Sequence, residues 1–487
     1  MGISIKLLYM EDIDLKPFLE ISYTDLEEMN LSAKQKRIKR ISPKTLRNFY
    51  IKYLIQEKRI KAVTIGFSDI EGRFHMLDYD KNFFLLSYDL LTFDGSSIRG
   101  FARQAESDLR LEIDWGAFWW LPSDVFGPGK VLIMGRILDQ NDKPYHMDSR
   151  AVLADYLDTL YQKEEYDVHV ASEIEGFLIK GIDAEKTYHE NPGFTLASMG
   201  GYFHSLPTDI LRQFIDKSAE AQRAMGFENE KDHPEVAPAQ FELNYSHTDA
   251  LIAADQIQIY KLVCRQIARN MGMTASFLPK PIVGINGSGM HTNISIHRNN
   301  KNLFYDAGGK DGLSKFAWKF ISRILTSAGD ISLILNASVN AYRRLDPHFE
   351  APNEIKVSAV DRGAMIRIPI HTEKSARIEG RSVGPDANPY LTAYTLIRTG
   401  LEGMIEKKDT NKRKRVKYLP GTIQNAMVLF RQSTWISYLL GDEFKKKYLH
   451  LKSVAADRSP VALGTKVKKG EVIYHHEIYN QLLWNEY

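Results

Sequence analysis

One acidic segment could bind metal ions. Glu173 and Glu175 alternate with apolar residues in the run 168–179. Because side chains of a strand alternate between its two faces, a strand here would place both carboxylates on one face. Like charges on a buried face repel each other and lose hydration, so they require a cation between them. Taken alone, the segment could equally be an exposed strand whose carboxylates face solvent.

More potential metal ligands follow along the chain. The run 233–244 is typical of a second strand and carries Glu235 and Glu242; His291 and Glu379 come later. A site rich in carboxylates, with one imidazole and no thiol, suits Mg²⁺ or Mn²⁺ better than zinc or copper. The sequence therefore predicts a site for two or more such cations.

Basic residues gather between positions 343 and 381. They are Arg343, Arg344, Arg362, Arg367, Lys374, Arg377 and Arg381. A structural network of ion pairs is one explanation for them. The other is phosphoryl transfer, in which the protein positions the reactants and neutralises migrating charge with metal ions and arginines. The residues alone thus predict a metal-dependent phosphoryl-transfer enzyme that acts on an anionic substrate.

The composition limits the partners and the compartment. The 487 residues are 44% hydrophobic and 26% charged, which indicates a folded chain of more than one domain. Lys and Arg (64) nearly balance Asp and Glu (61), so we expect neither nucleic acid nor membrane as a partner. Cys264 is the single cysteine, and neither a secretory signal nor a long apolar run is present. These features predict a cytoplasmic protein.

The pattern along the chain predicts three regions. Residues 1–45 are charged and helical in character and form an N-terminal appendage; the basic stretch 34–40 is expected to be a solvated helix face. Residues 46–148 form a small strand-rich domain. Residues 149–487 alternate strands and helices as an α+β catalytic domain, with a helical tail from about 421.

Several motifs, taken together and in order, resemble those of type I glutamine synthetases from about residue 60 to 403. They are Phe93-Asp94-Gly95-Ser96-Ser97, Glu173-Ile174-Glu175, Asn286-Gly287-Ser288-Gly289-Met290-His291, Ile366-Arg367-Ile368-Pro369 and Asn388-Pro389-Tyr390. Lys417 stands where adenylylated members carry tyrosine, and Arg103 matches a regulatory arginine of feedback-inhibited members. The resemblance is therefore to the feedback-inhibited, non-adenylylated branch.

This resemblance implies a fold, a reaction and an assembly. The fold would be an N-terminal β-grasp domain followed by a catalytic domain with a curved antiparallel sheet flanked by helices. ATP would phosphorylate the γ-carboxylate of glutamate, and ammonia would displace the phosphate. The homo-oligomer would be a dodecamer of two hexameric rings with active sites between subunits.

The resemblance also assigns residues to each ligand. One metal would be held by Glu175, Glu235 and Glu242, and the other by Glu173, His291 and Glu379. The residues implied for glutamate are Glu175, Asn286, Gly287, His291, Arg344, Glu350, Arg362 and Arg381. Those implied for ATP are Glu230, His247, Asn293, Ser295, Arg367, Lys374 and Arg377.

The implied catalytic group takes a proton from ammonium and stabilises the phosphoryl group in transfer. It consists of Asp94, Ser97, Tyr202, Glu350, Arg362 and Arg367, with Glu235 also in the ammonium pocket. Two alternatives stay open: a ligase that joins glutamate to a polyamine or another amine, and a structural relative without activity. Loss of the acidic pocket would favour the first, and loss of metal ligands the second.

Overall fold

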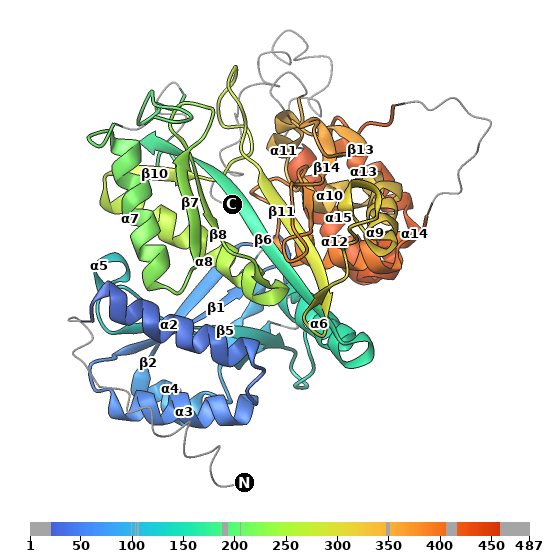
Figure 1. The fold of residues 1–487 in the computed structure, drawn as a ribbon. Helices are drawn as coiled ribbons and strands as arrows, with labels where there is room; N and C mark the ends of the chain where they lie inside the picture. The colour runs from blue at the N-terminus through green and yellow to red at the C-terminus, as the bar shows by residue number, and fades with distance from the viewer. Residues whose placement is uncertain are drawn as a thin grey trace. The chain divides into compact units, whose positions relative to one another are not determined.

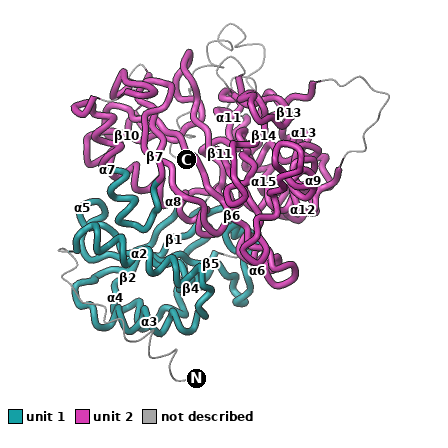
Figure 2. Tube along the Cα trace, in the orientation of Figure 1, with its two compact units in different colours: residues 1–69, 74–151, 217–229 teal, residues 70–73, 152–216, 230–487 magenta. Residues whose placement is uncertain are grey.

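The computed structural model describes residues 21–98, 100–102, 104, 107–187, 193–204, 206–346, 351–405 and 416–457. It divides into two compact units, coloured separately in Figure 2. Unit 1 comprises residues 1–69, 74–151 and 217–229, and unit 2 comprises residues 70–73, 152–216 and 230–487.

Unit 1 is built on a five-stranded sheet of order β2-β1-β5-β4-β3. The strands are β1 (Ala62–Ser68), β2 (Phe74–Asp80), β3 (Thr92–Asp94), β4 (Asp108–Trp120) and β5 (Lys130–Leu138). The apolar β1 is buried along almost its whole length, whereas side chains of the edge strand β2 alternate in exposure. β1 runs parallel to β5 and antiparallel to β2, so the sheet is mixed.

Helices of the N-terminal segment pack on this sheet. The helices of unit 1 include α2 (Tyr23–Ile38), α3 (Pro43–Gln56), α4 (Lys81–Ser87) and α5 (Ser123–Phe126), and a 3₁₀ turn, η2, spans Gly95–Ser97. The Ser42 side chain caps α3, and Pro43 lies in its first turn, where a missing N–H costs no helix hydrogen bond. Both α2 and α3 contact β4.

A buried asparagine attaches α2 to the rest of unit 1. Asn30 accepts a hydrogen bond from the Trp120 backbone N–H (3.0 Å) and donates to the carbonyls of Trp120 (3.0 Å) and Ala224 (2.8 Å). Lys34, one turn further on, is buried and pairs with Glu228 at 2.7 Å. The expectation of a solvated face is therefore wrong at Lys34, because a carboxylate from a distant segment compensates its charge.

Unit 2 is built on a ten-stranded sheet whose main path is β13-β14-β15-β11-β6-β8-β7. These strands are β6 (Tyr166–Lys180), β7 (Asn229–Pro234), β8 (Gln240–Tyr245), β11 (Met290–Arg298), β13 (Glu354–Ser358), β14 (Ala364–Arg367) and β15 (Ile378–Gly380). The short strands β9 (Thr248–Asp249) and β10 (Met273–Ser276) pair with β6, and β12 (Lys301–Asn302) pairs with β11. The long β6 and β11 cross the centre of this sheet as antiparallel neighbours (Figure 1).

Helices complete unit 2. They are α6 (Ser149–Glu164), α7 (Ile210–Ala224), α8 (Ala250–Asn270), α9 (Lys315–Thr326), α10 (Ala328–Leu335), α11 (Val339–Arg344), α12 (Pro389–Glu402), α13 (Ile423–Gln432), α14 (Thr434–Leu440) and α15 (Asp442–Asp457), of which α6 and α7 extend into unit 1, and η4 (Lys310–Gly312) is a 3₁₀ turn. The central helix α8 packs on β6 and β10, and the Tyr260 hydroxyl donates to the Ile174 carbonyl at 2.9 Å. The sheets and helices confirm the predicted α+β class.

The contacts of Asn30 predict that α2 contributes to the stability of unit 1. Replacing Asn30 with Ala leaves buried backbone groups without partners, at about 1–3 kcal/mol for each group. The Asn30→Ala variant should therefore unfold at a clearly lower denaturant concentration than the wild type. Glu28→Ala, on the exposed face of the same helix, is the control and should leave the midpoint unchanged. Equal midpoints for Asn30→Ala and wild type would contradict the prediction.

Candidate active site

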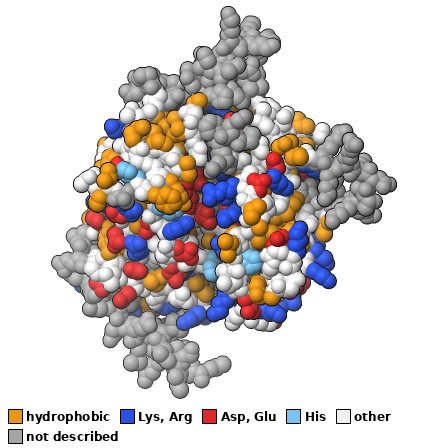
Figure 3. All heavy atoms as spheres, turned by 45° about the horizontal axis from the view of Figure 1, so that its top comes forward, with side chains coloured by type: hydrophobic (Ala, Val, Ile, Leu, Met, Phe, Trp, Pro, Cys, Tyr) orange, Lys and Arg blue, Asp and Glu red, His pale blue; other side chains and the backbone are white. Residues whose placement is uncertain are grey.

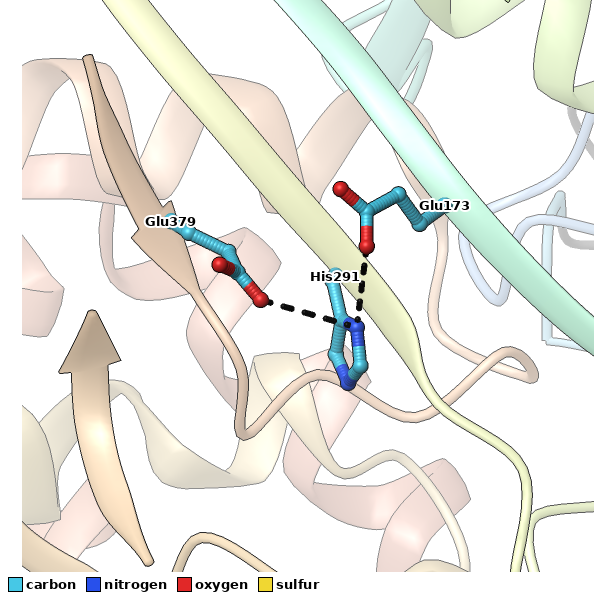
Figure 4. Close-up of side chains that lie close together, drawn as sticks. All are labelled: Glu173, His291 and Glu379. Atoms are coloured by element: carbon cyan, nitrogen blue, oxygen red, sulfur yellow. Dashed lines mark hydrogen bonds and ion pairs between the residues drawn. The ribbon is translucent and has the colours of Figure 1, made fainter. Parts of the chain in front are cut away.

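The strand register assembles a first cluster of metal-ligand side chains. His291 on β11 lies opposite Glu173 on β6, and Glu379 on β15 lies opposite Asn293 on β11. The Nδ1 atom of His291 is 3.4 Å from Glu173 Oε2 and 3.7 Å from Glu379 Oε1 (Figure 4). One ligand atom from each residue lies within 4.8 Å of the others. This spacing allows one cation to bind all three side chains.

Positive groups balance the charge of this first cluster. Burial by itself would raise the pKa of Glu173, but hydrogen bonds from His291 and Asn293 and the positive charge near the carboxylate lower it to about 2. Glu379 is almost fully buried and accepts bonds from Arg367 and Arg381, both at 2.9 Å. The Glu173 carboxylate therefore stays ionised at neutral pH, and two guanidinium groups pair with Glu379.

A second cluster forms at the β7–β8 connection. His233 lies 3.6 Å from the carboxylates of both Glu235 and Glu242. Burial, and after it the negative charge of Glu175, raises the pKa of Glu235 to about 7. The same two causes raise the pKa of Glu242 well above its usual range. Glu175 lies directly opposite Glu242 in the sheet.

The second cluster fits a divalent cation. Its carboxylates are buried close together, and like charges at this spacing are stabilised by a cation. The Nε2 atom of His233 is also buried without a hydrogen-bond partner among the described residues. Carboxylate oxygens with an imidazole nitrogen are a donor set that Mg²⁺ or Mn²⁺ can use.

The sequence pattern misassigned the backbone here and missed a residue. Residues 233–244 are not one strand: β7 ends at Pro234, and β8 begins at Gln240. Between the two strands Ala239 has a φ of 59°, which no extended strand accommodates. The prediction also omitted His233, although its place two residues before Glu235 was a usable signal.

A cavity of about 270 Å³ is lined by the second cluster and by Glu173 and His291 of the first cluster. Acidic and basic side chains lie side by side in a hollow on the face drawn in Figure 3. Every described residue that the resemblance implies for glutamate lines this cavity, namely Glu175, Asn286, Gly287, His291, Arg344, Arg362 and Arg381. Tyr202, Glu235 and Arg367 line it too. Glu350 lies outside the described residues.

One of the arginines in this cavity is fixed by the backbone. Arg344 is almost fully buried, and its guanidinium donates to the carbonyls of Arg381 (3.0 Å) and Val383 (3.3 Å). A guanidinium has five N–H donors in a planar fork, so further donors can still reach a ligand. Arg344 can thus offer a pre-oriented positive group to an anion.

A second cavity, of about 380 Å³, contains most of the residues implied for ATP. These are Glu230, His247, Asn293, Ser295, Lys374 and Arg377. Arg367 lines the first cavity instead. The two cavities share Glu173 and Lys231 in their walls. The residues implied for the two substrates therefore fall into two cavities that meet at a metal-ligand side chain.

Three stacked histidines extend from the wall of the second cavity. The ring of His169 lies 5.3 Å from that of His247 and 4.4 Å from that of His297. Burial, and after it the nearby imidazoles, lowers the pKa of His169 to about 4. Its ring is therefore neutral at neutral pH. His169 and His297 could not be predicted from the sequence pattern, because their proximity depends on which strands are neighbours in the sheet.

Asp94, predicted to act on ammonium, lies in unit 1 at the end of β3. Its carboxylate accepts hydrogen bonds from the backbone N–H and hydroxyl of Ser96 (2.9 and 2.6 Å) and from the Ser97 hydroxyl (2.5 Å). These bonds, chiefly those from Ser96, lower the pKa of Asp94. The carboxylate is exposed and ionised at neutral pH. Arg103 lies outside the described residues.

No helix among the described residues combines the length and apolar character needed to cross a bilayer.

Comparisons with known proteins give the family. Residues 59–140 match the β-grasp domain of glutamine synthetase, and residues 146–462 match its catalytic domain. These matches confirm the predicted two-domain fold.

Individual relatives agree with the family models. Glutamine synthetases of Staphylococcus aureus and Staphylococcus epidermidis are 33% identical over 428 residues, covering 84% of this chain and 94% of theirs. The fold is similar to Plasmodium falciparum glutamine synthetase (TM-score 0.76, 20% identity, 86% and 97% of the chains). It is also similar to a structure titled GmaS/ADP complex (TM-score 0.73, 23% identity, 87% and 99%). The chain therefore belongs to the glutamine synthetase family.

Proposed function

We propose that the two cavities bind glutamate and ATP and that their shared wall is where phosphoryl transfer occurs. The chain is an ATP-dependent ligase that forms glutamine from glutamate and ammonia. The observation that carries our assignment is the division of substrate residues between two cavities that share Glu173. Transfer of the γ-phosphoryl group of ATP to the γ-carboxylate of glutamate would then take place beside the two acidic clusters.

The acidic clusters support a proposal for the metal ions. Glu173, His291 and Glu379 would hold one divalent cation. Glu175, Glu235 and Glu242 would hold another, with His233 beside them. Mg²⁺ or Mn²⁺ bound here would neutralise charge on the phosphates.

The protein's own residues position the substrates. We assign Arg344 and the turn at Asn286 and Gly287 to binding of glutamate, with Arg381 nearby. Arg362 and Arg367 would stabilise the negative charge on the phosphoryl group as it moves. Because Arg367 already pairs with Glu379 at 2.9 Å, the same residue links the first acidic cluster to the phosphoryl group.

Ammonium needs an acidic pocket. We assign Asp94, Ser97, Tyr202, Glu235 and Glu350 to this pocket. Ammonium would give a proton to a carboxylate of this pocket, and the neutral amine would attack the acyl carbon of γ-glutamyl phosphate. The new C–N bond forms as the C–O bond to phosphate breaks, which releases inorganic phosphate and glutamine.

The assembly and its regulation are further proposals. Asp94 would come from an adjacent subunit in a hexameric ring, with two rings forming a dodecamer. Residues 1–45 would be an appendage to a β-grasp domain over 46–148, followed by the catalytic domain over 149–487. Arg103 would take part in feedback inhibition by glutamine, and the enzyme would be cytoplasmic.

The function is tested by phosphate release from ATP and glutamate in the presence of Mg²⁺. We expect turnover with ammonium and much slower turnover with putrescine or ethanolamine, because the proposed pocket binds a small cation with several carboxylates. Turnover only with an organic amine would instead support an amine ligase. An absence of turnover with every amine would support a structural relative.

Two Asp94 variants provide the control for this test. Asp94→Ala and Asp94→Asn both remove the negative charge, and the Asn variant retains an oxygen that can accept hydrogen bonds from Ser96 and Ser97. Both should lose most of the ammonium-dependent activity, about a hundredfold or more, with ATP affinity nearly unchanged. Full activity of the Asn variant would show that the charge at position 94 is not needed.

Metal binding should depend on pH. Glu235, with a pKa of about 7, is largely protonated at about pH 6 and ionised at about pH 8, and only the ionised form binds a cation. Without metal, a carboxyl whose pKa rises on folding lowers the stability of the folded protein as the pH increases. For Glu235 this loss occurs between the pKa of the unfolded chain and the folded-state pKa of about 7. Mn²⁺ should therefore raise the melting temperature more at about pH 8 than at about pH 6.

This dependence can be separated from general effects of charge. In Glu235→Gln the extra stabilisation by Mn²⁺ at high pH should shrink, because the titrating ligand is gone. The exposed Glu28→Gln is the control and should behave as the wild type does. Equal stabilisation by Mn²⁺ at both pH values in the wild type would contradict the assignment.

A further inference from the structure

Gln240 is a buried glutamine, 1% exposed, inside the first cavity. Its Nε2 lies 3.2 Å from Glu175 Oε2, 3.1 Å from the Gly287 carbonyl oxygen and 3.2 Å from the Ser288 hydroxyl. Its Oε1 accepts a hydrogen bond from the Ala237 backbone N–H at 3.2 Å. Both ends of the amide are therefore engaged, so its orientation is fixed.

The two carboxylate oxygens of Glu175 have different surroundings. Oε2 accepts hydrogen bonds from Gln240 and from the Gly289 backbone N–H at 2.9 Å. Oε1 lies 3.9 Å from Nε2 of His291, the residue shared with the first cluster. With Oε2 held by two donors, Oε1 is the oxygen left to bind a cation. Gln240 thus helps to determine which oxygen of the Glu175 carboxylate is available to a cation.

The other end of this contact is the glycine-rich turn 286–289. A Cβ atom on Gly287 would collide with the Pro279 carbonyl oxygen, so the turn is closely packed against its surroundings. Two groups join this turn to the Glu175 carboxylate: the Gly289 backbone N–H, which belongs to the turn itself, and the Gln240 amide, which also contacts Gly287 and Ser288. A shift of the turn on ligand binding would therefore also move the Glu175 carboxylate.

We propose that Gln240 is a positioning residue that couples metal binding at Glu175 to glutamate binding at the turn 286–289. The proposal rests on the proposed function, which places glutamate at Asn286 and Gly287. A cation that orders Glu175 also orders the turn through the amide, and glutamate on the turn orders Glu175. Each ligand should strengthen binding of the other by the same factor.

The test measures binding without ATP, by calorimetric titration of Mn²⁺ with and without saturating L-glutamate, and of L-glutamate with and without Mn²⁺. In the wild type we expect each ligand to increase the binding affinity for the other about fivefold or more. Gln240→Met keeps the side-chain length but removes the donors. In this variant Mn²⁺ affinity should fall about tenfold, and the coupling factor should fall clearly below the wild-type value, although the direct bond from Gly289 to Glu175 remains.

Two further variants keep the outcome clear. Gln222→Met removes another fully buried glutamine, which lies outside the cavity, and should leave both affinities unchanged. If Gln240→Met does not fold, Gln240→Glu replaces the donor with an acceptor at nearly the same volume and should weaken the coupling too. A folded Gln240 variant with wild-type coupling would overturn the proposal. A wild type that binds neither Mn²⁺ nor glutamate would instead overturn the proposed function.

Discussion

The antiparallel register of β6 with β11 and β8 is the constraint on which the candidate site depends. It places Glu173 opposite His291 and Glu175 opposite Glu242. Ile174, between the two glutamates, is fully buried on the other face of the strand. A register slip of one residue would exchange the two faces of β6, so that its apolar side chains would take the place of its carboxylates. Burial of the apolar face therefore also positions the carboxylates.

The two acidic clusters balance their charge in different ways. Glu379 is paired with Arg367 and Arg381, and Glu173 is held by His291 and Asn293, so the first cluster is compensated by the protein itself. In the second cluster the carboxylates repel one another, and the pKa values of Glu235 and Glu242 are raised. A cation therefore relieves more repulsion at the second cluster. In the first cluster, Glu379 instead holds Arg367 and Arg381, which line the first cavity.

Much of this arrangement could be predicted from the sequence. The alternation around Glu173 and Glu175 predicts a strand because the segment is central and its other face is apolar. Among the described residues, those that the family motifs assign to glutamate and to ATP line different cavities, except that Arg367 lines the first cavity. These signals are local, or they depend on motifs that occur in a fixed order along the chain.

Other features could not be predicted, because they depend on contacts between distant segments. Asn30 is polar and lies in a charged helix, yet it is buried by hydrogen bonds to residues 120 and 224. Pro234 ends β7, and the left-handed Ala239 precedes β8, so an apparently continuous strand is divided. His169 and Gln240 carry no sequence signal of their own, since their partners come from neighbouring strands and from the turn 286–289.

If the strand register builds two adjoining cation sites, each site should hold one divalent cation. The most direct measurement is the number of Mn²⁺ ions bound per chain in an equilibrium titration at about pH 8, which is above the pKa of Glu235. We expect two ions for the wild type and the loss of one tightly bound ion in Glu242→Gln. A wild type that binds fewer than two ions, or a Glu242→Gln variant that binds both as tightly as the wild type, would contradict this expectation.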